Sequence, residues 1–255
     1  MNLNGMEKLE KHFPDLTSSN GKTRVGLYAI GLLAIGTLYF ITSDNIPTWS
    51  IDSQIIIVAL GFLVMSLFFT RKKAYLQKHK ELAYRNAVLH YGLPGLALIL
   101  SAVAHAAYMN GPFVPRGWWT TVFIVVGLWT LTTGVILWIR SILAFGVDNL
   151  SLIYVYFPEE GSLVNSSIYG ILRHPVYGGV LRVMIGLALL NGNANAMAFI
   201  LFAPLLFTGW VRLVEEKDLI ERFGQSYLDY RKHMPAFWPK ISDLSKYFRF
   251  LLTGK

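Results

Sequence analysis

Long stretches without Lys, Arg or Glu dominate this sequence and limit what the chain can fold into. Residues 25–43 contain no charge at all, and further apolar stretches run at about 51–70, 87–109 and 118–139. About 20 apolar residues in a helix cross the hydrocarbon core of a bilayer. No stretch alternates apolar and polar residues as a barrel strand does. The pattern therefore predicts membrane-spanning helices.

The sequence after Pro175 predicts a helical hairpin. Two apolar runs, 180–190 and 196–211, are separated by an asparagine-rich turn at 191–195. These two helices are short enough that they only just span a bilayer. Together with the four earlier stretches, they predict an all-α integral membrane protein with about six transmembrane helices, a C-terminal helical hairpin and cytoplasmic cofactor-binding segments.

Composition excludes most other classes of protein. Charged residues make up 15% of the chain, against about 25% in an ordinary soluble domain, so there is too little polar surface for a water-soluble globule. The chain has no cysteine, which excludes disulfides, thiolate metal sites and a cysteine nucleophile. It also has no compact group of His and Asp residues, and we expect no metal.

The basic residues predict the orientation in the membrane. They gather in the N-terminal segment, in the loop 71–85 and in the tail from Arg212, whereas the alternate loops 44–53 and 110–117 together contain one basic residue. Basic loops stay on the cytoplasmic side, so we expect both termini in the cytoplasm. The net charge of +8 reflects this topology. We expect no nucleic-acid partner, because no basic stripe is interleaved with exposed aromatic residues.

Two longer polar segments lie on that same side. One is the connector 140–177 and the other is the tail from Arg212. Long connections are more often functional than idle, and these two enter and leave the same hairpin, so we expect them to meet. The chain then divides into an N-terminal segment (1–24), a four-helix transmembrane region (25–139), a core of connector, hairpin and cytoplasmic helices (140–240) and a basic tail (241–255).

The connector carries the sequence Arg-His-Pro at residues 173–175. The guanidinium of Arg173 suits a carboxylate, and the His174 ring can donate or accept a hydrogen bond. Pro175 restricts the residue before it to extended geometry and so directs both side chains. An arginine and a histidine that simply reach the interface beside a helix-starting proline explain the spacing equally well.

The tail carries two adjacent carboxylates, Glu215 and Glu216. Neighbouring charges pair at helical spacing, as Asp218 does with Arg222. Glu216 has no such partner, and a carboxylate at the membrane mouth lowers stability unless a cation meets it. A merely solvated Glu216 is the alternative.

Together these segments resemble the C-terminal half of the isoprenylcysteine carboxyl methyltransferase family, which is akin to the phospholipid methyltransferases. The resemblance covers about residues 161–239. It rests on R-H-P-x-Y-x-G at 173–179 followed by E-E-x-x-L-x-x-x-F-G-x-x-Y-x-x-Y at 215–230. It implies methyl transfer from S-adenosylmethionine, without a Rossmann domain, to a lipophilic acceptor that enters from the bilayer.

Carried over residue by residue, the resemblance implies a cofactor pocket lined by Leu163, Val164, Tyr169, His174, Tyr177, Gly179, Glu215, Glu216 and Leu219. Arg173 would hold a carboxylate of the cofactor or of the acceptor, and Glu216 would favour the cationic cofactor. Methyl transfer from a sulfonium mainly needs alignment and exclusion of water. The chain departs from the family pattern at Gly161, Ser167 and Met234, where His, Gly and Val are usual.

Two polar residues lie inside apolar stretches. Arg182 lies in the hairpin, where its charge needs a partner or water. We expect it to face the acceptor tunnel and to serve catalysis with Arg173 and Glu216. His105 lies near the far end of the third stretch, and we expect it to be a hydrogen-bonded structural residue.

Alternatives to this interpretation stay open. An NADPH-dependent membrane reductase on a related scaffold shares the glycine and tyrosine spacing, although the Glu215-Glu216 pair favours the methyltransferase. A transporter or non-catalytic scaffold would show more intramembrane charge or an inverted repeat. Prenylcysteine carboxylates, lipid amines, isoprenoids and small thiols all remain possible acceptors. We expect a prokaryotic plasma membrane as the location, and the oligomeric state is not readable.

Overall fold

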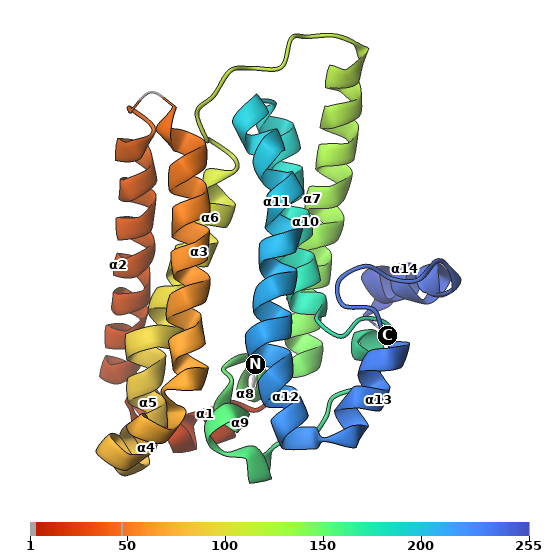
Figure 1. The fold of residues 1–255 in the computed structure, drawn as a ribbon. Helices are drawn as coiled ribbons and strands as arrows, with labels where there is room; N and C mark the ends of the chain where they lie inside the picture. Colours follow the sequence, from red (N-terminus) through yellow and green to blue (C-terminus); the bar gives the residue numbers. More distant parts are fainter. Residues whose placement is uncertain (1–3, 47, 255) are drawn as a thin grey trace.

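The computed structural model describes residues 4–46 and 48–254, and within these ranges the chain is built from helices without a β-strand. The long helices lie side by side as a bundle (Figure 1). They are α2 (Ser19–Ser43), α3 (Trp49–Thr70), α6 (Leu93–His105), α7 (Trp118–Phe145), α10 (Pro175–Asn191) and α11 (Ala194–Trp210). The prediction of an all-α integral membrane protein is confirmed.

Five helical segments in the described ranges are long and apolar enough to cross a membrane: Ser19–Ser43, Trp49–Thr70, Lys72–His105, Trp118–Phe145 and Ala194–Phe223. The sixth, α10, has 17 residues. At about 1.5 Å per residue it is slightly shorter than a hydrocarbon core of about 30 Å. The first helix of the predicted hairpin is therefore the short one.

Two of these segments are longer than the apolar pattern predicts, because helices continue into the polar regions. The basic loop 71–85 is largely helical and forms α4 (Lys72–His79) and α5 (Ala83–Ala87), which a π-helix, η3 (Val88–Gly92), joins to α6. Lys, Leu, Gln and Ala are good helix formers, so a charged segment can continue a membrane helix into water. In the same way α11 continues through a π-helix, η6 (Val211–Glu215), into α12 (Glu216–Phe223).

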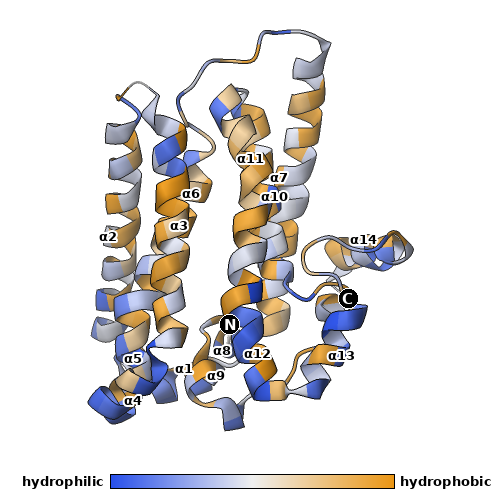
Figure 2. Ribbon diagram, in the orientation of Figure 1, coloured by the Kyte–Doolittle hydropathy of each residue, from blue (hydrophilic) through white to orange (hydrophobic). Residues whose placement is uncertain are grey.

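One end of the bundle carries most of the polar segments. There lie α1 (Met6–His12), α8 (Val147–Leu150), α9 (Ile153–Tyr156), α12 and α13 (Gln225–His233), while α14 (Leu244–Thr253) crosses the side of the bundle (Figure 1). Hydrophilic residues gather at this end and hydrophobic residues along the long helices (Figure 2). The connector and the tail therefore lie at one end of the molecule.

Glycines allow α7 and α10 to pack closely. A Cβ atom on Gly186 would lie 2.6 Å from the backbone nitrogen of Leu131, and one on Gly179 would lie 2.8 Å from the Cα of Trp138. Small residues let membrane helices approach to backbone contact. This contact holds the start of α10, and with it the Arg-His-Pro segment, against the end of α7.

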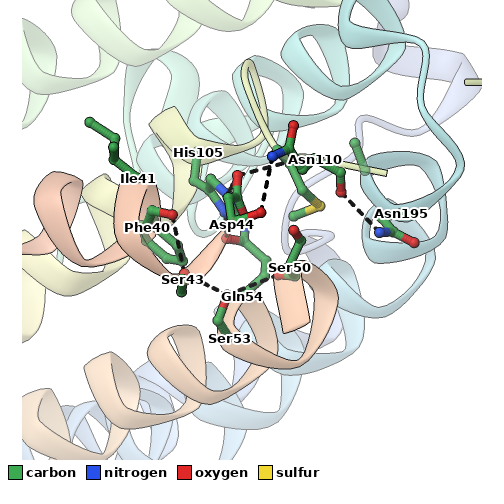
Figure 3. A network of polar contacts seen from close by, with 12 residues as sticks. Phe40, Ile41, Ser43, Asp44, Ser50, Ser53, Gln54, His105, Asn110 and Asn195 are labelled. Atoms are coloured by element: carbon green, nitrogen blue, oxygen red, sulfur yellow. Dashed lines mark hydrogen bonds and ion pairs between the residues drawn. The ribbon is translucent and has the colours of Figure 1, made fainter. Parts of the chain in front are cut away.

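A buried polar network ties the helices together at the opposite end (Figure 3). His105 Nδ1 lies 2.7 Å from Gln54 Oε1, and His105 Nε2 lies 3.0 Å from Asp44 Oδ2. The His105 ring also stacks on Phe40, with centroids 4.0 Å apart. The prediction of a hydrogen-bonded structural histidine is confirmed. The network joins α2, α3 and α6.

Candidate cofactor site

The connector and the tail are joined by main-chain hydrogen bonds. The N–H of Arg173 donates to the carbonyl of Pro235 over 2.9 Å, and the N–H of His174 donates to that of Ala236 over 3.0 Å. Neither segment is helical at this contact, because Pro175 disfavours helical geometry in the residue before it and α13 has ended on the other side. The two polar segments thus meet as the sequence predicts, and they form one wall.

Glu216 lies at the centre of this wall, with none of its surface exposed. Its carboxylate is 2.9 Å from Arg173 Nη2, 3.2 Å from His174 Nε2 and 3.3 Å from Arg231 Nε. The sequence argument that a cation must meet this carboxylate agrees with the structure. A buried carboxylate that contacts three cationic side chains holds connector and tail together.

Arg173 is occupied by these internal contacts. Its Nε lies 3.1 Å from Glu216 Oε1, and its Nη1 donates to the main-chain carbonyls of Arg231 and Met234. Most of its donors therefore face protein atoms. Its observed role is to fix the tail against the connector, although its side chain also reaches the edge of the cavity described below.

His174 lies between the two carboxylates. Its Nδ1 is 3.5 Å from Glu215 Oε1 and its Nε2 is 3.2 Å from Glu216 Oε1. Burial lowers the pKa of His174, but hydrogen bonds with Glu215 and Glu216 more than offset it, so the pKa lies above its ordinary value. A ring with a carboxylate at each nitrogen is stabilised in its doubly protonated form.

The π-helix η6 ends at Glu215, and α12 begins at Glu216. The two carboxylates point in different directions. A π turn changes the direction of the side chains that follow it, and such turns are frequent at functional sites. Glu216 points into the protein, whereas Glu215 lines a cavity. Glu215 Oε2 is buried and has no hydrogen-bond partner among the described residues. The Tyr177 hydroxyl interacts with the same carboxylate.

The cavity that Glu215 faces, called here the main cavity, lies between the connector, α12 and α13. Six of its lining residues are Phe or Tyr, and Phe145 stacks on Tyr169 with ring centroids 4.6 Å apart. The lining residues are Phe145, Asn149, Leu152, Tyr154, Val155, Ser162, Leu163, Val164, Tyr169, Arg173, His174, Glu215, Leu219, Arg222, Phe223, Tyr227 and Tyr230.

A second cavity, the side cavity, adjoins the main one and shares Tyr169, Arg173, His174 and Glu215 with it. It extends to the start of α10 through Val176 and Tyr177, and to Leu150. The Tyr177 ring packs against Trp210 of α11, with centroids 5.9 Å apart. Main and side cavity therefore form one region that leads from the tail helices toward the bundle.

Most residues predicted to contact the cofactor come together in this region. Those that line the main cavity are Leu163, Val164, Tyr169, His174, Glu215 and Leu219, and Tyr177 lines the side cavity.

Three predicted residues lie elsewhere, and their placement is corrected. Gly179 lines neither cavity, because it serves the close contact with α7. Glu216 lies behind the wall, where its cationic partners hold it. Arg182 lines a separate cavity beside α14, and it does not meet Arg173 or Glu216.

Sequence reasoning missed the contribution of the end of α7 and the first part of the connector. Phe145, Asn149, Leu152, Tyr154 and Val155 line the main cavity, but they read as a plain continuation of an apolar stretch. The unusual length of the connector was the only sequence signal for them. Among the described residues, no group of three or more His, Asp or Glu side chains could hold a metal ion.

Comparison with known proteins shows that this region is similar to methyltransferases. Residues 122–226 match the sequence model of the phospholipid methyltransferase family. Protein-S-isoprenylcysteine O-methyltransferase B of Arabidopsis thaliana is 28% identical over 155 residues, which are 60% of this chain and 75% of the relative. The protein-S-isoprenylcysteine O-methyltransferase of Schizosaccharomyces pombe is 36% identical over 85 residues, 32% of this chain and 35% of the relative.

A bacterial relative is named for a different substrate. The methanethiol S-methyltransferase of Pseudomonas deceptionensis is 33% identical over 84 residues, 33% of this chain and 31% of the relative. No solved structure matches the chain significantly. These relatives confirm the resemblance that the sequence motifs predict.

Proposed function

Because its C-terminal part is related to the phospholipid and isoprenylcysteine methyltransferases, we propose that this membrane protein transfers a methyl group from S-adenosylmethionine to a lipophilic acceptor at the cytoplasmic face. The observation that carries the proposal is the buried Oε2 of Glu215 in an aromatic cavity. It supplies a negative group where a cationic methyl donor needs one.

The residues of the main cavity fit such a donor. S-adenosylmethionine supplies an activated methyl group on a positively charged sulfonium sulfur. Glu215 offers a buried carboxylate oxygen that has no hydrogen bond within 3.5 Å among the described residues, and the Tyr177 hydroxyl interacts with the same carboxylate. The rings of Phe145, Tyr169 and Tyr230 offer aromatic surface of the kind that attracts cations. A carboxylate among rings binds a cation better than a neutral molecule, so it favours the charged donor over the neutral product.

The buried ion pairs orient the carboxylate. His174 holds Oε1 of Glu215 from one side, and Glu216 holds His174 from the other. Arg173 forms an ion pair with Glu216. This positive charge offsets the repulsion between the neighbouring carboxylates of Glu215 and Glu216. We assign Arg173, His174 and Glu216 as positioning residues and Glu215 as the residue that contacts the donor.

The side cavity provides a place for the acceptor. It reaches Leu150, Val176 and Tyr177 at the start of α10, beside helices that we place in the bilayer. A lipophilic molecule could enter there without crossing water, and the aromatic walls would exclude water from the reacting atoms. The relatives act on a prenylated cysteine and on methanethiol according to their names.

Isothermal titration of the full-length protein in detergent tests the proposal. We expect S-adenosylmethionine to bind more tightly than S-adenosylhomocysteine, and Glu215→Gln to reduce that preference about tenfold, which corresponds to about 1.4 kcal/mol. Glu221→Gln is the matched control, because Glu221 is exposed on the same helix. The control should retain the preference.

Transfer of a labelled methyl group into fractionated membranes then identifies the acceptor. Label should enter a lipid, protein or volatile fraction with wild type and with Glu221→Gln, and much less with Glu215→Gln. Tight binding of NADPH with no binding of either adenosyl compound would instead support a reductase and overturn the proposal.

A further inference from the structure

A third cavity lies on the outer side of α7 and α10, next to α14. It shares no lining residue with the main or the side cavity. Its lining residues are Trp129, Thr130, Thr133, Arg182, Trp238, Pro239, Leu244, Tyr247 and Phe248. We call it the Arg182 cavity, and the proposed methyl transfer does not use it.

Arg182 is buried in this cavity, with 5% of its surface exposed. Its Nη1 donates to the main-chain carbonyls of Gly178 and Phe237 over 2.7 and 3.0 Å. Its guanidinium carbon lies 4.1 Å from the centroid of the Trp238 ring. No carboxylate forms an ion pair with it in the described part of the chain. A buried guanidinium without an anion is unfavourable within a membrane helix.

A second donor faces the same space. Tyr247 is 4% exposed, and its hydroxyl is buried without a hydrogen-bond partner among residues 4–46 and 48–254. Its ring centroid lies 5.5 Å from the Arg182 guanidinium carbon. Buried polar groups are almost always hydrogen-bonded in folded proteins. Thr130, Thr133, Pro239, Leu244 and three aromatic side chains make up the rest of the lining. One buried cation and one buried hydroxyl without a partner are the donor set for an anion.

The surroundings indicate that the anion belongs to a lipid. Apolar side chains that line the cavity are exposed on its outer side, with Trp129 at 59%, Phe248 at 38% and Leu244 at 37%. Such exposed apolar residues on membrane helices and an amphipathic helix face acyl chains. Basic pockets between membrane helices attract anionic headgroups, and Arg182 is the basic residue that lines this one.

We propose that the Arg182 cavity binds the phosphate of an anionic membrane phospholipid, held by Arg182 and Tyr247, with the acyl chains along α7 and α14. The bound lipid also joins α14 to the bundle, because Tyr247 lies on α14 and Arg182 on α10. The site is independent of the methyl-transfer proposal, and it is tested by binding alone.

Native mass spectrometry of the detergent-purified full-length protein, titrated with dioleoylphosphatidylglycerol, tests this site. Wild type should retain one tightly bound lipid, and Arg182→Gln should bind it at least about tenfold more weakly, as expected for loss of a charge-assisted hydrogen bond. Arg249→Gln removes a positive charge from the exposed surface of α14 and should change this affinity less than about twofold.

Two further ligands separate the possible sources of the anion. Dioleoylglycerol, which lacks the phosphate, should not occupy the site, and inorganic phosphate at the lipid concentration should not displace the lipid. Equal affinity of wild type and Arg182→Gln, equal binding of dioleoylglycerol, or displacement by inorganic phosphate would each overturn the proposal.

Tyr247→Phe keeps the result decisive if Arg182→Gln does not fold. This variant removes only the hydroxyl and keeps the ring in place. We expect its lipid affinity to fall several-fold while its thermal stability without lipid stays close to that of wild type. An unchanged affinity in Tyr247→Phe would contradict the assigned donor set.

Discussion

At the scale of single residues, the adjacent Glu215 and Glu216 show how burial assigns different roles to identical side chains. Glu216 is fully buried and contacts Arg173, His174 and Arg231. Glu215 lines the main cavity, and one of its oxygens has no hydrogen-bond partner among the described residues. The first carboxylate stabilises the wall, and the second is available to a ligand. The roles can be separated by measuring stability and binding in parallel.

Replacement of Glu216 should lower stability strongly. Glu216→Gln leaves three cationic side chains without their carboxylate, and removal of one partner from a buried ion pair costs about 3–5 kcal/mol. We expect a clear fall in the thermal midpoint in detergent. Glu221→Gln on the same helix should change stability by less than about 0.5 kcal/mol. Similar midpoints for the two variants would show that the buried ion pairs contribute little.

The proton on His174 makes stability depend on pH. Because the folded-state pKa of His174 is raised, its contribution is fully present below the unfolded-state value of about 6.5. It is lost as the pH rises through the higher folded-state pKa. The thermal midpoint of wild type should therefore decrease as the pH is raised above 6.5. The midpoint of His174→Gln should decrease less over the same pH range. Parallel profiles for the two proteins would contradict the assigned protonation.

At the scale of elements, the contact between α7 and α10 positions the site. Arg173 and His174 directly precede α10 and lie in the wall, and the end of α7 contributes Phe145 to the main cavity. Gly186 and Gly179 permit the approach of the two helices. The glycine of the Arg-His-Pro motif thus acts through helix packing.

A side chain at Gly186 should separate these helices. The Cβ atom would lie 2.6 Å from the backbone nitrogen of Leu131. A backbone atom cannot move aside as the end of a flexible side chain can. We expect Gly186→Val to destabilise the protein by at least about 1–3 kcal/mol, as overpacking does. Gly209→Ala in α11 is the control, because nothing lies within 4 Å of its added Cβ. A thermal shift assay should show Gly209→Ala unchanged or slightly stabilised.

At the scale of the whole molecule, the two ends of the bundle have different tasks. One end contains the main and side cavities, and the other contains the network of Asp44, Gln54 and His105 (Figure 3). Gln54 Nε2 donates to the carbonyl of Ala102 over 2.8 Å, so Gln54 Oε1 accepts from His105 Nδ1. His105 Nε2 lies 3.0 Å from Asp44 Oδ2. Asp44 Oδ1 is buried without a hydrogen-bond partner among the described residues, and the contacts that the network does make join α2, α3 and α6 and serve stability.

Asp44→Asn should therefore affect stability and leave the distant site unchanged. We expect a loss of about 1–3 kcal/mol from the disturbed buried hydrogen bonds, with the dissociation constant of S-adenosylhomocysteine within twofold of wild type. Asp52→Asn, at an exposed position in the first turn of α3, should match wild type in both measurements. A weakened ligand affinity in Asp44→Asn alone would mean that the two ends are coupled.

The sequence by itself determined the membrane class, the approximate helices and the pair of polar segments that meet. These features depend on hydrophobic length and charge distribution, which are local properties of the chain. The motifs also identified most of the predicted cavity residues, because the spacing of Tyr169, His174 and Leu219 follows the resemblance to a family.

Tertiary structure alone decided which side chains face the cavity. The π-helix η6 directs Glu215 outward and Glu216 inward, and α-helical spacing could not predict that reversal. Gly179 lies outside the main and side cavities because it packs against α7. Arg182 lies outside them because its side chain faces the cavity beside α14. Side-chain direction depends on helix register and on neighbours distant in the chain. A pattern within one segment contains no information about either.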